Sequence, residues 1–236
     1  MNILSDGPLF PDGHPWGVRT EDDARALQHA LASRVREEPL DAAAVREVGG
    51  VDVSAREGRL QAAVVVWDCP ANRLAHYALA QQPEPMPYRP GFLSFREIPV
   101  IQAAWARLAQ RPEVLLVDGH GIAHPRGLGI AAHLGVLLDW PTVGVAKRRL
   151  VGRLAAPLGS ERGSRAPLVW RGRVIGMAVR TRTGVKPVWV SVGHRVTLDA
   201  AVELVLRCSR YRLPEPIRAA HRLAGAWEQN SGTAAE

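Results

Sequence analysis

Three strand-like runs follow one another near the start of the chain with very short connections. The runs are VGGVDVSA (48–55), RLQAAVVVWD (59–68) and RLAHYALA (73–80), and only REG and CPAN separate them. Connections this short, rich in turn-forming residues, join antiparallel neighbours, because a parallel crossover needs a dozen or more residues. The sequence therefore predicts that the fold begins with an antiparallel meander.

The pattern then changes to helices that alternate with short apolar strands. We expect a helix over about 92–110, a strand over 114–117, a helix over about 126–138 and a strand, TVGVA, over 142–146. A hairpin over 167–179, a strand over 187–193 and two C-terminal helices follow. The fold class that we predict is α/β: a mixed sheet, with an antiparallel meander followed by parallel strands and with helices on both faces.

The N-terminal part of the chain contains one more expected helix, over about 20–38. Thr20 can cap it, the acids at 21–23 suit its positive end, and Pro39 ends it. Its apolar face carries Leu27, Leu31 and Val35. We see no repeat and no long linker, so we expect a single domain over 1–236 with a disordered tail over about 228–236.

Composition excludes several classes of protein. No stretch approaches the roughly eighteen apolar residues that span a bilayer, and the first residues lack a basic and then apolar leader, so we expect a cytoplasmic protein without a membrane partner. The two cysteines, Cys69 and Cys208, are too few for a disulfide framework or a zinc site.

Positive charge is concentrated in one segment. Residues 147–186 contain eleven Lys or Arg and a single acid, Glu161, although the whole chain carries a net charge of only +7. A basic surface of this kind suits a polyanion such as nucleic acid, because binding releases counterions from the phosphates. An arginine-rich composition that merely decorates the surface is the alternative.

Two aspartates lie on or at the end of apolar strand-like runs. Asp52 lies inside GGVDVSA and Asp118 ends VLLVDGHG, while Glu97 falls on the helix between them in sequence. A buried carboxylate needs a metal, a base or hydrogen bonds to offset its desolvation, although an aspartate before glycine often only caps a turn. Three oxygen ligands favour Mg²⁺, with Mn²⁺ as a substitute, and such a site beside a basic surface is typical of phosphodiester cleavage.

The residue types around these acids are also informative. Gly119 and Gly121 can bring backbone N–H groups close to a ligand, although a tight turn explains them equally well. Only two of the 30 basic residues are lysines, and Lys147 ends a strand, where a compact ammonium suits a single phosphate oxygen. His120 and His124 flank the glycine turn as candidate proton donors, whereas we expect His133 to be structural.

Taken together, these residues resemble the endonuclease V family, also called deoxyinosine 3′ endonuclease. The match runs in order through GVDVS (50–54), PYRPGFLSFRE (87–97), DGHGIAHPRGLGIAAHLG (118–135), TVGVAKRRL (142–150), SVGHR (191–195) and LPEPIRAAHRLA (213–224). The family has an RNase H-like fold, with which the expected order of strands and helices agrees.

The resemblance implies a function and assigns roles to residues. Asp52, Glu97 and Asp118 would bind Mg²⁺, and Lys147 and His221 would assist at the phosphate. The site for the DNA backbone would include Arg148 and Arg149. The family cleaves the second phosphodiester 3′ to inosine and leaves 3′-hydroxyl and 5′-phosphate ends. The implied partner is DNA that contains deaminated bases, with RNA as a further candidate, and we expect a monomer.

The same resemblance implies a wedge and a base pocket. The wedge, which fills the gap left by an extruded base, consists of Pro87, Tyr88, Arg89 and Pro90. The pocket is lined by Gly91, Leu93, Gly119, Gly121, Ile122 and His124. Relatives more often carry an apolar residue at the position of Arg89, which suggests contact with a phosphate or stacking on a base.

Two other functions remain open at this stage. The same carboxylates suit an RNase H-like nuclease that cuts flaps or junctions. The basic segment alone suits a non-catalytic module that binds lesions or RNA, although acids in a phosphate-binding cleft hinder binding unless a metal is present.

Overall fold

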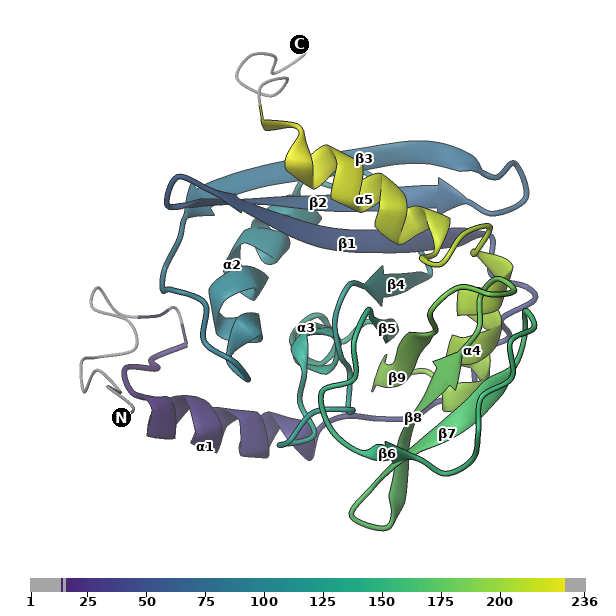
Figure 1. Ribbon diagram of the computed structural model, residues 1–236. Coiled ribbons are helices and arrows are strands. Elements are labelled where there is room, and N and C mark those ends of the chain that lie inside the picture. The colour runs from purple at the N-terminus through teal and green to yellow at the C-terminus, as the bar shows by residue number, and fades with distance from the viewer. Residues whose placement is uncertain (1–13, 15, 228–236) are drawn as a thin grey trace.

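A single mixed sheet of nine strands forms the centre of the computed structural model, which describes His14 and residues 16–227 (Figure 1). The predicted tail at 228–236 lies outside the described residues. The strands are β1 (Glu47–Arg56), β2 (Arg59–Asp68), β3 (Arg73–Pro83), β4 (Val114–Val117), β5 (Thr142–Ala146), β6 (Arg153–Leu154), β7 (Arg165–Trp170), β8 (Arg173–Val179) and β9 (Val188–His194). Their spatial order is β3-β2-β1-β4-β5-β9-β8-β7-β6.

The pairing of the strands confirms the predicted fold class. β1, β2 and β3 form the antiparallel meander, and β4 and β5 continue the sheet in parallel with β1. The short connections between the first three strands allow no other pairing, whereas helices connect the parallel strands. The sheet then returns to antiparallel pairing from β9 to β6.

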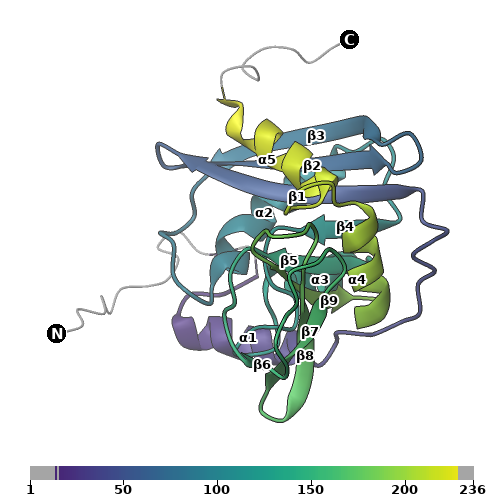
Figure 2. The ribbon, with the colours of Figure 1, turned by 45° about the vertical axis from the view of Figure 1, so that its right-hand side comes forward.

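Helices cover both faces of the sheet, as the sequence predicts. They are α1 (Glu21–Ala32), α2 (Leu93–Ala106), α3 (Ile130–Leu138), α4 (Leu198–Arg207) and α5 (Glu215–Gly225). Alternate residues of β2 pack on opposite sides: Ala62 and Val64 face α2, while Ala63 and Val65 face α5. Figure 1 shows α5 and α2 on opposite sides of the meander, and the view of Figure 2 agrees.

The short central strand β4 is buried along its whole length. Val114 and Leu116 pack into the cluster that includes α4, and Leu115 and Val117 pack into the cluster that includes α2 and α3. A strand that is covered on both faces needs apolar side chains at every position, which explains why VLLV does not alternate between apolar and polar residues.

The N-terminal helix is shorter than predicted. Thr20 caps α1 with a reciprocal bond to Asp23, as its sequence suggests, but the helix ends at Ala32 and not near residue 38. The expectation was wrong at that end because tertiary contacts take over the following segment. Arg36 pairs with Asp139, and its backbone N–H donates to His194 Nδ1 at 3.2 Å.

Two further helices are also shorter than expected. α2 ends at Ala106 rather than near residue 110, and α3 begins at Ile130 rather than near residue 126. Two glycines precede α3 and delay its start. Gly127 has a positive φ of 69°, which is not helical, and Gly129 is the N-cap. Within the described part of the chain, no helix is both long and apolar enough to cross a membrane.

Candidate active site

Asp52 and Asp118 lie side by side because their strands pair in parallel. Val51 of β1 is in register with Val117 of β4, and the Asp118 N–H donates to the Val51 carbonyl at 3.2 Å. Asp52 follows Val51 within β1, and Asp118 follows Val117 directly after β4. The two aspartates therefore lie next to each other in the sheet. Their side chains are only 13% and 11% exposed.

A basic side chain pairs with each of these carboxylates. Lys147, directly after β5, donates a hydrogen bond from its ammonium group to Asp118 Oδ2. His221 of α5 bonds Asp52 through Nδ1 at 2.7 Å. Asp52 is opposite Ala63 of β2, whose side chain faces α5, and residues opposite each other share a face of the sheet. The fold thus brings residues 52, 118, 147 and 221 together, as the sequence predicts.

Glu97 approaches the pair from α2, on the other side of the sheet. The pKa of Glu97 is raised to about 8, mainly by burial and also by the charges of Asp52 and Asp118, while Arg96, whose Nη1 donates to Glu97 at 3.1 Å, opposes the shift. Burial and the nearby Asp118 also raise the pKa of Asp52, against His221 and Lys147. Burial and the neighbouring carboxylates thus disfavour the charged forms of Glu97 and Asp52, and a bound cation would offset that cost.

The geometry suits an open rather than a closed metal site. Among the described residues, no group of three His, Cys, Asp or Glu side chains lies close enough to hold a metal ion alone. Mg²⁺ commonly uses one or two carboxylates and completes its shell with water and substrate phosphates. Asp52 and Asp118 meet that requirement, so this pair fits Mg²⁺ or Mn²⁺, whereas the predicted third ligand, Glu97, does not form a group of three with them.

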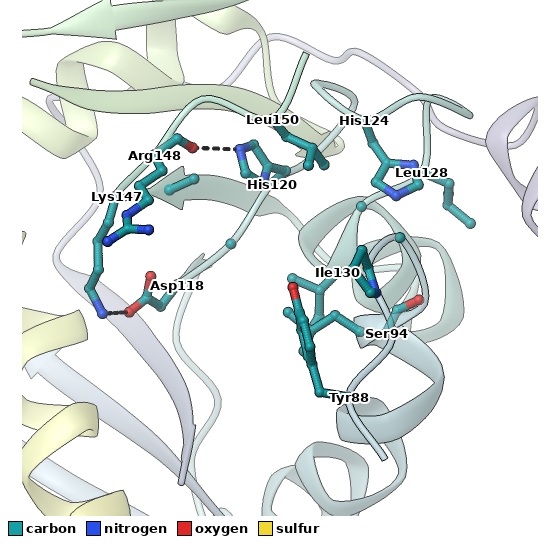
Figure 3. A pocket seen from close by; sticks show the side chains of 16 residues that line it. Tyr88, Ser94, Asp118, His120, His124, Leu128, Ile130, Lys147, Arg148 and Leu150 are labelled. Atoms are coloured by element: carbon teal, nitrogen blue, oxygen red, sulfur yellow. Dashed lines mark hydrogen bonds and ion pairs between the residues drawn. The ribbon is translucent and has the colours of Figure 1, made fainter. Parts of the chain in front are cut away.

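A cavity of about 330 Å³ opens beside this carboxylate pair. Asp118 and Lys147 lie on one side of it and Tyr88 on the other (Figure 3). The walls come from the loop before α2, the loop between β4 and α3, and the loop after β5. Its size is at the lower end of the range for small-ligand sites, which suits a single heterocyclic base.

Comparison with known proteins identifies the family. The endonuclease V family model matches residues 29–222. The chain is 51% identical over 217 residues to endonuclease V of Rhodospirillum centenum, covering 90% of each protein. The chain belongs to the endonuclease V family. It is accordingly a nuclease, a hydrolase of phosphodiester bonds.

Solved structures of the family have the same fold. Endonuclease V of Streptomyces avermitilis superposes with a TM-score of 0.82 at 44% identity, covering 87% of this chain and 91% of that one. Endonuclease V of Ciona intestinalis, in complex with a 24mer DNA containing an inosine followed by a ribo-adenosine, superposes with a TM-score of 0.76 at 27% identity. The latter covers 86% of this chain and 95% of that one.

The expected wedge lies at the rim of the cavity in this family member. Tyr88 and Pro90 line the cavity, and Tyr88 is 61% exposed. Pro87 is exposed beside it, and Arg89 is partly buried in an ion pair with Glu21. The structure therefore directs Arg89 toward α1, which neither of the roles suggested by the sequence anticipates.

Four of the six expected pocket residues line the cavity: Gly91, Leu93, Gly119 and His124. Gly121 and Ile122 do not. Gly121 is buried, its N–H donates to Ser191 Oγ at 2.8 Å, and a Cβ there would lie 1.8 Å from the Val192 carbonyl oxygen. Gly121 is thus a packing glycine, and Ile122 packs against the neighbouring core. Sequence order alone could not separate Gly121 from Gly119.

The histidines of the glycine turn have different surroundings. Burial lowers the pKa of His124 to about 3, so it is neutral, and it bonds the Gly91 backbone while its Nδ1 accepts from the Arg126 N–H. His120 lines the cavity and bonds the Arg148 carbonyl at 3.0 Å, and burial lowers its pKa. His133 is fully buried beside Ser94, which agrees with the structural role expected for it.

Several residues of the cavity wall were not found from the sequence. They are Ser94, Leu128, Gly129, Ile130, Ala146 and Leu150. For Leu150 the sequence offers a signal, because an apolar residue follows Lys147 by three positions within a basic run. In the structure the Leu150 side chain is 44% exposed. The two arginines expected to contact the DNA backbone lie in different places. Arg148 lines the cavity, whereas the Arg149 guanidinium lies 5.9 Å from the centre of the Trp189 ring.

Proposed function

We propose that this chain is a Mg²⁺-dependent endonuclease that initiates repair of deaminated DNA by cutting the second phosphodiester 3′ to inosine. The products are a 3′-hydroxyl and a 5′-phosphate, and the lesion stays in the strand. The observation that carries the proposal is that Asp118 lies beside Asp52, where β4 runs next to β1, and also lines the base-sized cavity. A base held in the cavity thus leaves the phosphates downstream of it near the carboxylates.

The carboxylates would hold a divalent cation beside the substrate. Asp52 and Asp118 would bind Mg²⁺ or Mn²⁺, with Glu97 as a further oxygen donor. A divalent cation held there supplies Lewis-acid stabilisation of the phosphate charge and favours ionisation of the attacking water. Lys147, already bonded to Asp118, places its ammonium where it can bind a single phosphate oxygen.

His221 is suited to move a proton at the Asp52 side of the site. Its side chain is 67% exposed, and its Nδ1 is bonded to Asp52. That bond fixes the orientation of the ring and leaves Nε2 directed away from the carboxylate, available to water or a leaving oxygen. Asp52 accordingly has two roles, as a cation ligand and as the group that orients His221.

The cavity selects a small purine edge through its backbone groups. Gly91 and Gly119 bring the main chain to the wall without side chains, and Leu93, Leu128 and Ile130 supply apolar contact. Tyr88 at the rim can replace the stacking that the extruded base loses. The solved Ciona intestinalis relative with inosine-containing DNA supports inosine as the base.

A mapped nicking assay tests the proposal. Labelled oligonucleotides with one inosine, or adenine at the same position, are incubated with Mg²⁺, Mn²⁺ or EDTA, in DNA and in RNA, with flap and mismatch substrates alongside. We expect a divalent-dependent cut at the second linkage 3′ to inosine. Asp118→Asn should lower the rate by at least about a hundredfold. Asp199→Asn, an exposed acid on α4, is the matched control.

Three results would contradict the proposal. They are cutting that persists in EDTA, a cut at another linkage, and equal cutting of inosine and adenine. Preferential cutting of the flap substrate would instead favour a structure-specific nuclease. The comparison of DNA with RNA decides which of the two polymers is the better substrate.

A further inference from the structure

The loop that carries Tyr88 is tied to α1 by an ion pair. Arg89 Nη1 donates to Glu21 Oε1 at 2.8 Å, and both side chains are less than one-third exposed. The other oxygen of Glu21 accepts from Arg25 at 2.5 Å, so the carboxylate is itself held in place. The residue next to Tyr88 is therefore anchored on the first turn of the N-terminal helix.

A second anchor holds the other end of the same loop. The Gly91 carbonyl accepts from Gln28 Nε2 at 2.9 Å and from Arg126 Nη2 at 2.8 Å, and Arg126 also bonds Gln28. Gln28 is fully buried. Gly91 has a φ of 83°, and a Cβ there would lie 2.7 Å from Arg126, so the sequence is restricted to glycine at this point.

Phe92 completes the attachment through apolar contact. It is 4% exposed and packs in one cluster with Val18, Ala24 and Leu27 of the N-terminal segment. Arg25 and Arg126 lie 5.7 and 4.8 Å from the centre of its ring. Residues 89, 91 and 92 all contact α1, and Figures 1 and 2 show the segment between β3 and α2 descending toward that helix.

The tip of this loop is exposed. Tyr88 is 61% exposed while its neighbours on the C-terminal side are held, and prolines at 87 and 90 restrict the backbone on both sides. A side chain that replaces an extruded base must resist the tendency of the base to return. A loop that is already ordered loses less entropy when it does so.

We propose that α1 is a brace for the Tyr88 loop, in which Glu21 (through Arg89) and Gln28 (through the Gly91 carbonyl) are positioning residues for base extrusion. The inference rests on the proposed function for the role of Tyr88. Glu21 and Gln28 precede residue 29, where the match to the family model begins, so the brace does not follow from that match. It also accounts for an arginine at position 89.

The first test separates positioning from a general structural role. Single-turnover cutting is measured on an inosine in duplex DNA and on the same strand alone, because only the duplex demands extrusion against pairing. Glu21→Gln should lower the duplex rate about three- to tenfold and the single-strand rate by less than about twofold. Glu37→Gln, an exposed acid beyond the end of α1, should change neither rate.

Charge reversal supplies the rescue. Glu21→Arg or Arg89→Glu alone should lower the duplex rate, and the two together should recover part of the loss, since the pair between positions 21 and 89 is restored in the opposite sense while Arg25 loses its partner. If Glu21→Gln changes the duplex and single-strand rates by the same factor, or if the double reversal recovers nothing, the brace is rejected.

Hydrogen exchange tests the brace without any reliance on catalysis. In the full chain, Glu21→Gln should speed amide exchange over residues 86–93 relative to the wild type and Glu37→Gln, because the loop then opens more often. Unchanged exchange overturns the brace. Wild-type protein that does not cut at inosine overturns the proposed function instead, so the two failures are distinguishable.

Discussion

At the scale of single residues, the choice of lysine at position 147 is the most informative. Lys147 is one of only two lysines among 30 basic residues, and it donates to Asp118 at the edge of the cavity. An ammonium is compact, whereas a guanidinium is wider and binds as a planar fork. A lysine at this position therefore places a single compact positive charge next to Asp118.

We therefore expect Lys147→Arg to behave as a loss of function. The single-turnover rate on inosine DNA should fall by about a hundredfold, close to the loss in Lys147→Gln, because charge without the right geometry does not restore the contact. Lys186→Arg, at the other and exposed lysine, should match the wild type. Retention of more than about a third of the activity by Lys147→Arg would show that charge alone suffices there.

His124 yields a prediction about pH and stability. Its pKa is lowered to about 3 by burial, below the ordinary value of 6.5, so the unfolded chain binds a proton more readily than the folded one. The contribution of neutral His124 to the free energy of unfolding is fully present above pH 6.5 and is lost as the pH falls from 6.5 toward 3. His124 thus contributes to acid unfolding, by an amount on the order of a few kcal/mol.

Replacing His124 with a residue that does not titrate should reduce this dependence. His124→Gln lowers stability at pH 7, since the bond to Gly91 is disturbed, but its free energy of unfolding should fall less than that of the wild type between pH 6.5 and 4. Urea unfolding at several pH values measures both. Carboxylates elsewhere titrate in both proteins and cancel in the comparison. Parallel pH profiles would show that His124 is not protonated on unfolding in this range.

At the scale of elements, local patterns predict the strands better than the helix ends. The bounds of β2, β4 and β5 were predicted to the residue, because each lies between clear turn signals or is continuously apolar. The end of α1 was wrong, because Arg36 leaves the helix to pair with Asp139, more than a hundred residues away in sequence. Contacts of that range leave no local signal.

The same limit applies to the candidate site. Aspartates at strand ends, a rare lysine and a histidine in a matching motif can be found from the sequence, and the structure brings them together. The distinction between Gly119 in the cavity wall and Gly121 beneath it depends on the approach of β9, which no spacing reveals. The link from Glu21 to Arg89 was likewise out of reach, since the residues are 68 positions apart.

At the scale of the whole molecule, the basic segment 147–186 has two kinds of arginine. Arg162 and Arg180 direct their guanidinium groups to backbone carbonyls, including those of Ser209 and Gly159, and so stabilise the fold. Arg148 and Arg149 are exposed beside the cavity and beside Trp189. Part of the positive charge of this segment thus belongs to arginines that stabilise the fold. Only the exposed arginines are available to a phosphate backbone.

The salt dependence of binding distinguishes these groups. Each phosphate contact to single-stranded DNA contributes about 0.7 to the slope of log K against log salt concentration. In EDTA, where binding is measured without cutting, Arg148→Gln should reduce the slope by about that amount for single-stranded inosine DNA. Arg173→Gln, on the hairpin of β7 and β8, removes the same charge from an exposed position outside the cavity wall and should leave the slope unchanged. If the two variants reduce the slope equally, binding depends on the overall charge of the segment rather than on a contact at the cavity, because a diffuse field does not distinguish one exposed arginine from another.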